Sequence, residues 1–408
     1  MSYNKENLKK IYGDGKGVQE FDGRVSKLSR VFENKFGISY SDIFSSPGRI
    51  EIVGNHTDHN HGQVLVGAID CDMLGVTMKA TNVHIISEGF PDIIFDINDT
   101  ILNEHEKGSS KAMVKGVIQG FKNNGFTIGG FRMAMDSKIF KGAGVSSSAA
   151  YELLIAEILN FYYNGDSLDR FKMAEVGQYS ENVYFGKPCG LLDQSGISFG
   201  GIVNIDFENP KSPKVNPLGC DLLGLEVVIV NTGDHSNLTN EYADIRLEMN
   251  AVANFFGKSV LREVDKNEFF KNIKTLRENV SDRAILRAIH FYDENDRVQK
   301  AVDGIKNKDV SKLISAIEES GLSSQTNLQN AYKEGSRSQG ISLAVAIAKE
   351  NISHGTARVH GGGFAGTIIA FVSKAEKQEF ANKMADIFGK ENVFSATLRE
   401  SGSCHLQA

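Results

Sequence analysis

The sequence predicts an α+β protein with two lobes, and three observations support this fold class. Strand-like and helical segments are mixed along the chain instead of alternating strictly. Neighbouring strand-like segments lie only a hairpin apart, which disfavours a doubly wound parallel sheet. The length of 408 residues exceeds that of one typical domain. We therefore expect mixed sheets and helices arranged in two lobes.

In the first half of the chain, apolar residues recur at helical spacing in four segments, of which the one at 149–163 is the strongest. The others are 18–36, 113–125 and 171–186. Strands are expected at 50–53, 63–69, 73–80, 84–88, 93–97, 131–137 and 201–207. A serine run precedes the helix at 149–163 and can cap it, because a serine hydroxyl accepts hydrogen bonds from free backbone N–H groups.

A turn-rich segment at 208–219 holds three of the six prolines and is the best candidate for a domain boundary. We predict an N-terminal lobe over 1–210 and a C-terminal lobe over 211–408. A strand at 225–233 opens the second lobe, and amphipathic helices continue to about residue 350. A glycine turn, a strand and a helix end it, and the last residues can return to the first lobe.

Composition excludes several classes of function. The net charge of −6 argues against a nucleic-acid or membrane partner. No apolar run approaches the roughly 20 residues that span a bilayer, and the polar N-terminus lacks the apolar core of a signal peptide. The four cysteines are scattered without C-x-x-C pairs, so we expect a cytoplasmic protein without structural zinc.

Two glycine-rich stretches suggest phosphate or nucleotide binding. KGAGVSSSAA (141–150) precedes the strongest helix, whose free N–H groups would attract an anion, although a glycine turn with a capping serine is an equal alternative. No Walker motif occurs. HGGGFAG (360–366) matches G-x-G-x-x-G, but a strand is expected after it where a dinucleotide-binding motif needs a helix, so a glycine hairpin is favoured.

Two further stretches carry candidate catalytic or ligand groups. In GKPCGLLDQSGISFGG (186–201), Asp193 could be a general base, a metal ligand or a turn former. GNHTDHNHG (54–62) gathers three histidines, but it lacks the fixed spacing and the cysteines of a typical metal site. We expect His59 and His61 to be solvent-facing loop residues or to lie at the rim of a pocket.

Together these stretches resemble the galactokinase branch of a superfamily of small-molecule kinases. SPGRIEIVGNHTDHNHG (46–62) is similar to the family signature P-G-R-V-N-L-I-G-E-H-T-D-Y-N-x-G. GAGVSSSAA (142–150), PCGLLDQ (188–194) and RVHGGGFAG (358–366) are similar to the family's phosphate loop, its P-C-G-I-M-D-Q motif and its C-terminal glycine motif. The segments 113–119 and 231–246 also resemble family segments, and all six occur in the family's order.

The resemblance implies transfer of the ATP γ-phosphoryl group to the anomeric hydroxyl of a galactose-like sugar, with Mg²⁺ as cofactor. It also implies an active site in the cleft between the two lobes. Asp193 matches the catalytic base and Arg49 the arginine that keeps this base ionised. Ser148 and Glu181 match the Mg²⁺ ligands. The phosphate-binding positions implied are Gly142, Gly144, Ser146, Ser147, Ser148, Gly362 and Gly363.

On the sugar side, the resemblance implies contacts from His56, Asp58, Gly190 and Tyr242. Asn55 stands where the family carries a glutamate that accepts from the sugar's C6 hydroxyl. An asparagine there would tolerate a C6 carboxylate, so a kinase for galacturonate or another C6-variant sugar is the alternative. The partners expected are a small sugar and ATP, and the chain is expected to be a monomer or a weak homo-oligomer.

The chain contains no tryptophan, whereas the family often has one near the adenine. The apolar segment MVKGVI (113–118) could line that pocket instead. A sugar- and ATP-binding sensor without catalysis is a third reading. The intact serine run and Asp193 disfavour it.

Overall fold

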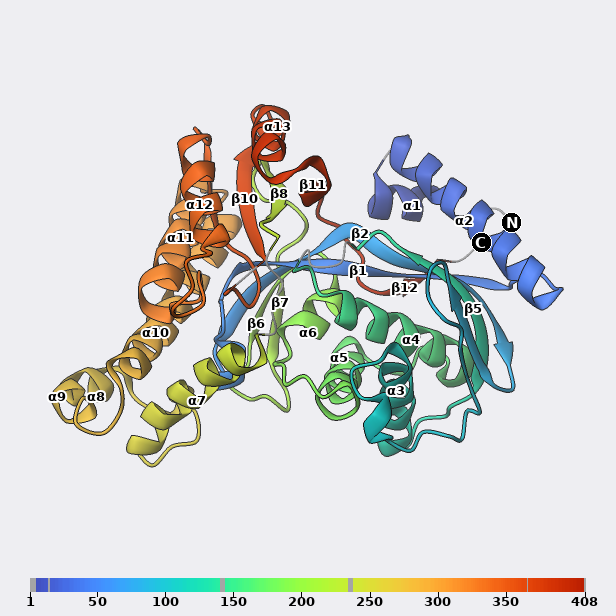
Figure 1. Ribbon diagram of the computed structural model, residues 1–408, viewed down its shortest axis with the longest axis horizontal. Coiled ribbons are helices and arrows are strands. Elements are labelled where there is room, and N and C mark those ends of the chain that lie inside the picture. Colours follow the sequence, from blue (N-terminus) through green and yellow to red (C-terminus); the bar gives the residue numbers. More distant parts are fainter. Residues whose placement is uncertain (1–4, 14, 140–143, 234–237, 365, 407–408) are drawn as a thin grey trace.

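The computed structural model describes residues 5–13, 15–139, 144–233, 238–364 and 366–406. These residues form two sheets surrounded by helices, which confirms the predicted α+β class (Figure 1). None of the helices in the described ranges is both long and apolar enough to cross a membrane.

The larger sheet has eight strands among the described residues, in the order β12-β1-β2-β5-β3-β4, with β6 paired to β2 and β7 to β6. All pairs are antiparallel except β3 with β5. Its strands are β1 (Asp42–Val53), β2 (Gln63–Ala80), β3 (Val83–Ser87), β4 (Ile93–Phe95), β5 (Gly130–Ser137), β6 (Ile202–Asp206), β7 (Lys214–Pro217) and β12 (Cys404–His405).

The strand β2 replaces the two separate strands expected at 63–69 and 73–80. Its pairing with β1 jumps from Asp72, opposite Pro47, to Ile69, opposite Gly48. The two residues between Ile69 and Asp72 therefore form an irregularity within one continuous strand. A bulge of this kind interrupts the alternation of buried residues without ending the strand, so the sequence pattern alone shows a break.

Helices cover both faces of the larger sheet (Figure 1). One face carries α3 (Ser110–Asn123), α4 (Ser147–Asn164), α5 (Arg170–Tyr179) with its π-helical extension (Ser180–Phe185), and α6 (Leu192–Phe199). The other face carries α1 (Lys5–Tyr12) and α2 (Lys16–Phe36). The helix α4 is buried along most of its length, which explains the continuous apolar run at 149–163.

The smaller sheet has the order β11-β8-β10-β9, all antiparallel. Its strands are β8 (Leu225–Asn231), β9 (Gly355–Val359), β10 (Thr367–Ser373) and β11 (Val393–Ala396). Val228 and Val230 of β8 pack with the helices α12 (Gly340–Glu350) and α13 (Lys377–Phe388). Val227 and Ile229 face the main core, so alternate residues of β8 join two different clusters.

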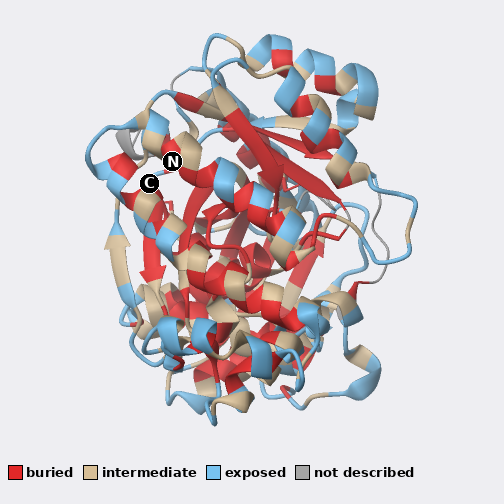
Figure 2. Cartoon of the chain, turned by 90° about the vertical axis from the view of Figure 1, so that its left-hand side faces the viewer, coloured by how far each residue is buried: buried red, intermediate tan, exposed pale blue. Residues whose placement is uncertain are grey.

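The remaining helices lie beside the smaller sheet and at the far end of the molecule from the termini (Figure 1). They are α7 (Thr239–Phe255), α8 (Lys266–Lys271), α9 (Ile273–Leu276), α10 (Asp282–Lys306) and α11 (Val310–Ser323). Short helical turns occur at Asp58–Asn60, Glu104–Glu106, Leu261–Glu263, Ser324–Leu328 and Lys390–Asn392. Figure 2 shows that burial is concentrated in the strands and in the inner faces of the helices.

Both ends of the described chain lie at the larger sheet, because β12 pairs with β1 beside the N-terminal helices (Figure 1). A buried polar cluster holds them there. The carboxylate of Asp72 accepts hydrogen bonds from Arg24 Nη1 at 2.6 Å and Tyr12 Oη at 2.6 Å, and it lies 3.5 Å from Arg399 Nη1. The exact limits of the two lobes remain a prediction.

Candidate active site

The strand β1 contacts the glycine- and serine-rich loop at 144–148 and continues into the histidine-rich loop at 54–62. A Cβ on Gly48 would lie 3.0 Å from the carbonyl oxygen of Val145, which is closer than an ordinary van der Waals contact, so the glycine lets the loop lie close to the strand. The next residue fixes the contact, because Arg49 N donates to the same carbonyl at 3.1 Å. The side chain of Arg49 is 5% exposed and its Nη1 donates to Gly144 O at 2.6 Å.

Asp193 lies at the first turn of α6, a helix that the sequence analysis did not anticipate. Arg49 Nε and Nη2 each lie 2.7 Å from its Oδ1, and Ser146 Oγ donates to its Oδ2 at 2.6 Å. Burial raises the pKa of Asp193, but the charge and hydrogen bonds of Arg49 and the Ser146 hydroxyl outweigh it and hold that pKa below its ordinary value. Asp193 is therefore an ionised carboxylate at neutral pH.

The serine run begins α4, but not by the capping bond that the sequence suggested. Ser146 occupies the cap position in a left-handed conformation, with φ of 63°, and within the described part of the chain its side chain makes no capping hydrogen bond. Its hydroxyl is directed to Asp193 instead. Ser147, the first helical residue, and Gly144 are exposed, whereas Gly142 lies outside the described residues.

Ser148 and Glu181 form a second polar contact beside the same loop. Ser148 Oγ donates to Glu181 Oε1 at 2.9 Å, and Lys187 Nζ lies 3.3 Å from the same oxygen. Gln194 Nε2 donates to Glu181 Oε2 at 2.8 Å. A hydroxyl and a carboxylate are hard oxygen donors of the kind that Mg²⁺ prefers, so this pair fits the ion chemically.

Asp58 and Gly190 approach each other across the site. A Cβ on Gly190 would lie 1.8 Å from Asp58 Oδ2, so no other residue fits there without a shift. The backbone N–H groups of His59 and Leu192 donate to Asp58 at 2.9 and 3.4 Å. Burial and the nearby negative charge of Asp193 raise the pKa of Asp58 to about 6. Asp58 and Asp193 therefore have pKa values shifted in opposite directions.

His56 faces the glycine turn. Its Nε2 lies 3.0 Å from Gly362 O, so this nitrogen carries the proton and Nδ1 is left as an acceptor. Burial lowers the pKa of His56 to about 4, and the imidazole is neutral at pH 7. The ring of Tyr242 lies 6.3 Å from that of His56, and a Cβ on Gly362 would lie 2.4 Å from the tyrosine ring.

The turn at 360–366 connects the antiparallel strands β9 and β10. The expected hairpin is confirmed, although the sequence analysis missed β9 before it. A strand follows the turn, whereas a dinucleotide-binding motif has a phosphate-binding helix at this place, so the G-x-G-x-x-G match is not such a motif. Gly363 has a φ of 77°, and a Cβ there would lie 2.2 Å from Asn330 O.

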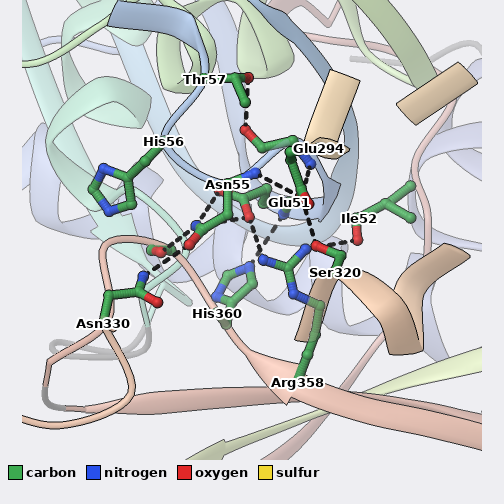
Figure 3. A network of polar contacts seen from close by, with 12 residues as sticks. Glu51, Ile52, Asn55, His56, Thr57, Glu294, Ser320, Asn330, Arg358 and His360 are labelled. Atoms are coloured by element: carbon green, nitrogen blue, oxygen red, sulfur yellow. Dashed lines mark hydrogen bonds and ion pairs between the residues drawn. The ribbon is translucent and has the colours of Figure 1, made fainter. Parts of the chain in front are cut away.

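Asn55 does not offer its side chain to a ligand. The residue is 1% exposed. Its Nδ2 donates to Glu51 Oε1 at 2.9 Å and to Gly361 O at 2.8 Å, and its Oδ1 accepts from Asn330 Nδ2 at 2.7 Å (Figure 3). The direct contact with a sugar C6 group that the sequence suggested for Asn55 is therefore replaced by contacts within the protein.

His59 and His61 do not lie fully in solvent, so of the two expectations for them the rim of a pocket is the one compatible with the structure. Both are only partly exposed. Asn60 Nδ2 lies 3.0 Å from His59 Nδ1, while Leu261 N donates to Asn60 Oδ1 at 2.9 Å. This fixes the proton of neutral His59 on Nε2, a buried atom with no hydrogen-bond partner among the described residues.

Several residues of the site were missed by sequence reasoning. Lys187 and Gln194 contact Glu181, while Glu51, Asn330 and Arg358 surround Asn55. Gln194 ends the quoted motif PCGLLDQ and Arg358 begins RVHGGGFAG, so both could have been noticed. Asn330 lies in no glycine-rich or charged motif, and only the fold brings it to the loop.

Comparisons with known proteins show which proteins the chain is similar to. The galactokinase galactose-binding signature matches residues 30–79, and the GHMP kinases N terminal domain matches residues 112–201. A galactokinase of Glaesserella parasuis is 30% identical over 373 residues, which cover 90% of this chain and 94% of that protein. A galactokinase of Limosilactobacillus reuteri is 29% identical over 384 residues, with 91% and 95% covered.

Two solved structures share the fold. The galactokinase of Lactococcus lactis complexed with galactose aligns with a TM-score of 0.81 and 26% identity, covering 93% of this chain and 99% of that one. A mevalonate kinase aligns with a TM-score of 0.63 and 15% identity, covering 88% and 100%, and this likeness concerns the fold alone.

Proposed function

The chain belongs to the galactokinase family, and on that premise we propose that it transfers the γ-phosphoryl group of ATP to the anomeric hydroxyl of galactose. The products are galactose 1-phosphate and ADP. The observation that carries the proposal is the arrangement of Arg49 and Ser146 around the two oxygens of Asp193. This arrangement sets an ionised carboxylate next to the loop at 144–148, which resembles a phosphate-binding loop, as phosphoryl transfer to a hydroxyl requires.

Asp193 is the proposed base. The anomeric oxygen attacks the γ-phosphorus, the bond from that phosphorus to the bridging oxygen of ADP breaks, and the hydroxyl proton passes to Asp193. A carboxylate with a low pKa suffices because in a loose transition state the hydroxyl loses its proton late. Arg49 keeps the carboxylate ionised, and the same guanidinium donates to Gly144 O and so links the base to the loop.

The phosphates of ATP are assigned to Gly142, Gly144 and the serine run, with Gly362 and Gly363 on the opposite side. Backbone N–H groups at the start of α4 would donate to phosphate oxygens, and the helix dipole favours negative charge there. Ser148 and Glu181 would hold Mg²⁺. The ion, when bound, neutralises charge on the β- and γ-phosphates.

The sugar is assigned to His56, Asp58, Gly190 and Tyr242. Neutral His56 presents Nδ1 as an acceptor, and Asp58 adds a carboxylate. Both groups can therefore accept hydrogen bonds that sugar hydroxyls donate. Gly190 is the residue whose lack of a side chain leaves room beside Asp58. We further propose lobes at 1–210 and 211–408, a cytoplasmic location and a monomer or weak homo-oligomer.

An ADP-release assay across galactose, galacturonate, fucose, galactosamine, N-acetylgalactosamine, arabinose and glucose tests this function. We expect galactose to give the highest kcat/KM. Turnover of galacturonate with inert galactose would replace the proposed substrate by the C6-variant alternative. Binding of galactose and ATP without turnover of any sugar would support the sensor.

A further inference from the structure

We infer that Asn55 is a positioning residue: with Glu51, Asn330 and Arg358 it forms a buried clamp, so named below, that fixes the loop 54–58 against the glycine turn 361–364. The kinetic test of this inference rests on the proposed function, whereas the structural test by hydrogen–deuterium exchange does not. Figure 3 shows these side chains converging between β1, the glycine turn and the helices of the second half of the chain.

The clamp is built on a buried ion pair. Arg358 Nη2 donates to Glu51 Oε1 at 2.9 Å, and its Nη1 donates to Ile52 O at 3.0 Å. Glu51 is 3% exposed and Arg358 is fully buried. A buried carboxylate requires such a partner, because an isolated charge in the interior is costly. The negative charge of the clamp therefore belongs at position 51, facing Arg358.

Asn55 connects this ion pair to the glycine turn. One side of its amide contacts both Glu51 oxygens, at 2.9 and 3.1 Å, and Gly361 O at 2.8 Å. All three partners are acceptors, so the amide nitrogen must face them. The amide oxygen then faces Asn330 Nδ2, which also donates to Gly362 O at 3.1 Å.

The backbone of the loop 54–58 is also held by hydrogen bonds to buried side chains. Gly54 N and Asn55 N donate to Glu294 Oε1 at 2.9 and 3.2 Å, and His290 Nε2 lies 2.9 Å from Asn55 O. His56 shares Gly362 O with Asn330. The loop proposed to bind the sugar and the turn proposed to contact ATP are thus one hydrogen-bonded unit, and a shift of one moves the other.

The clamp also explains why Asn55 replaces a glutamate. The family signature quoted above has asparagine at the position of Glu51 and glutamate at that of Asn55, so the amide and the carboxylate are exchanged as a pair. A glutamate at 55 alone would face both Glu51 oxygens and Gly361 O, so two buried carboxylates would lie side by side and would repel each other or have to take up a proton. Restoring the family residue at one position alone therefore breaks the clamp.

The exchange gives a direct kinetic test with three variants: Asn55→Glu, Glu51→Asn, and both together. We expect each single variant to lower kcat/KM at least tenfold for galactose and for ATP alike, with the galactose-to-galacturonate ratio unchanged. The double variant should regain at least half of the lost activity on a logarithmic scale. A single Asn55→Glu variant that changes the sugar ratio tenfold while the KM for ATP stays constant would overturn the inference, because Asn55 would then be a sugar contact.

A second measurement does not depend on activity. Hydrogen–deuterium exchange of Asn330→Ala should increase in 54–62 and in 360–366 together, although these segments are about 300 positions apart in the sequence. Asn327→Ala, whose side chain contacts Thr326 Oγ1 at 3.2 Å, is the matched control and should leave both segments unchanged. Increased exchange in one segment only, or in neither, would refute the clamp. An inactive wild-type protein with the coupled exchange would refute the proposed function alone.

Discussion

Arg49 contacts Asp193 through two nitrogens, Nε and Nη2, each 2.7 Å from Oδ1, while its third nitrogen donates to Gly144 O. One guanidinium therefore joins the proposed base to the proposed phosphate loop. The planar fork of arginine makes these contacts simultaneously, which the single ammonium of lysine cannot do. The proposed base and the proposed phosphate loop are thus held together by one planar guanidinium.

The first prediction concerns the base. Asp193→Asn should lower kcat by about 10²–10⁴-fold, the usual contribution of a positioned general base, while galactose still binds. Turnover is measured by ADP release and galactose binding by calorimetry. Ser146→Ala, which removes only the hydrogen bond to Oδ2, should cost much less. Near-normal kcat in the Asp193→Asn variant would remove Asp193 from the mechanism.

The second prediction concerns the pH dependence of the reaction. Arg49→Lys weakens the contact that lowers the pKa of Asp193, so this pKa should rise toward its ordinary value. Since the base must be ionised, the acid limb of kcat/KM should move to higher pH. A pH–rate profile of both enzymes measures this shift. An unchanged acid limb would mean that Arg49 does not control the ionisation of the base.

The third prediction concerns the metal. Glu181→Gln keeps the size of the side chain but removes the charge beside Ser148. The Mg²⁺ concentration that gives half-maximal activity should therefore rise by about tenfold or more. Direct binding of Mn²⁺ in the presence of an ATP analogue gives a readout independent of turnover. Asp99→Asn, on a carboxylate that contacts Lys115 instead, is the control. Equal metal affinity in both variants would contradict the assignment.

The fourth prediction concerns the sugar pocket. Gly190→Ala places a methyl group 1.8 Å from Asp58 Oδ2, so the carboxylate must shift and the KM for galactose should rise by tenfold or more. Gly23→Ala in α2 meets nothing within 4 Å and should behave like the wild type. Steady-state kinetics of the two variants make the comparison. A rise confined to the KM for ATP would place Gly190 in the nucleotide site.

The fifth prediction concerns stability. Asp72→Asn leaves Arg399 buried without its counter-charge and removes one of the two carboxylates that Arg24 contacts, the other being Asp136, which should cost about 3–5 kcal/mol at pH 7. Burial alone would raise the pKa of Asp72, but the two arginines lower it. The stabilisation is therefore complete above the unfolded pKa of about 3.9 and is lost as the pH falls through the lower folded value. Urea unfolding at several pH values should show the variant and the wild type converging in acid, and a constant difference would disprove this linkage.

The sequence by itself determined the fold class and most elements, because these follow from local patterns. The helix at 149–163 and the strand at 131–137 fall within one or two residues of α4 and β5. The resemblance also brought forward Arg49, Asp193, Ser148 and Glu181, which lie in quoted motifs or pair with a residue of one. The structure gathers these residues into two adjoining contacts.

Only the tertiary structure decided what Asn55, Ser146 and His59 do. A motif gives the type of a side chain but not its partners, and a hydrogen bond is made with whichever group the fold brings within about 3 Å. Asn330 lies 275 positions from Asn55, and Gly361 lies 306 positions away. The sequence could name Asn55 as unusual, but its partners satisfy the amide inside the protein, which makes it part of the frame of the site.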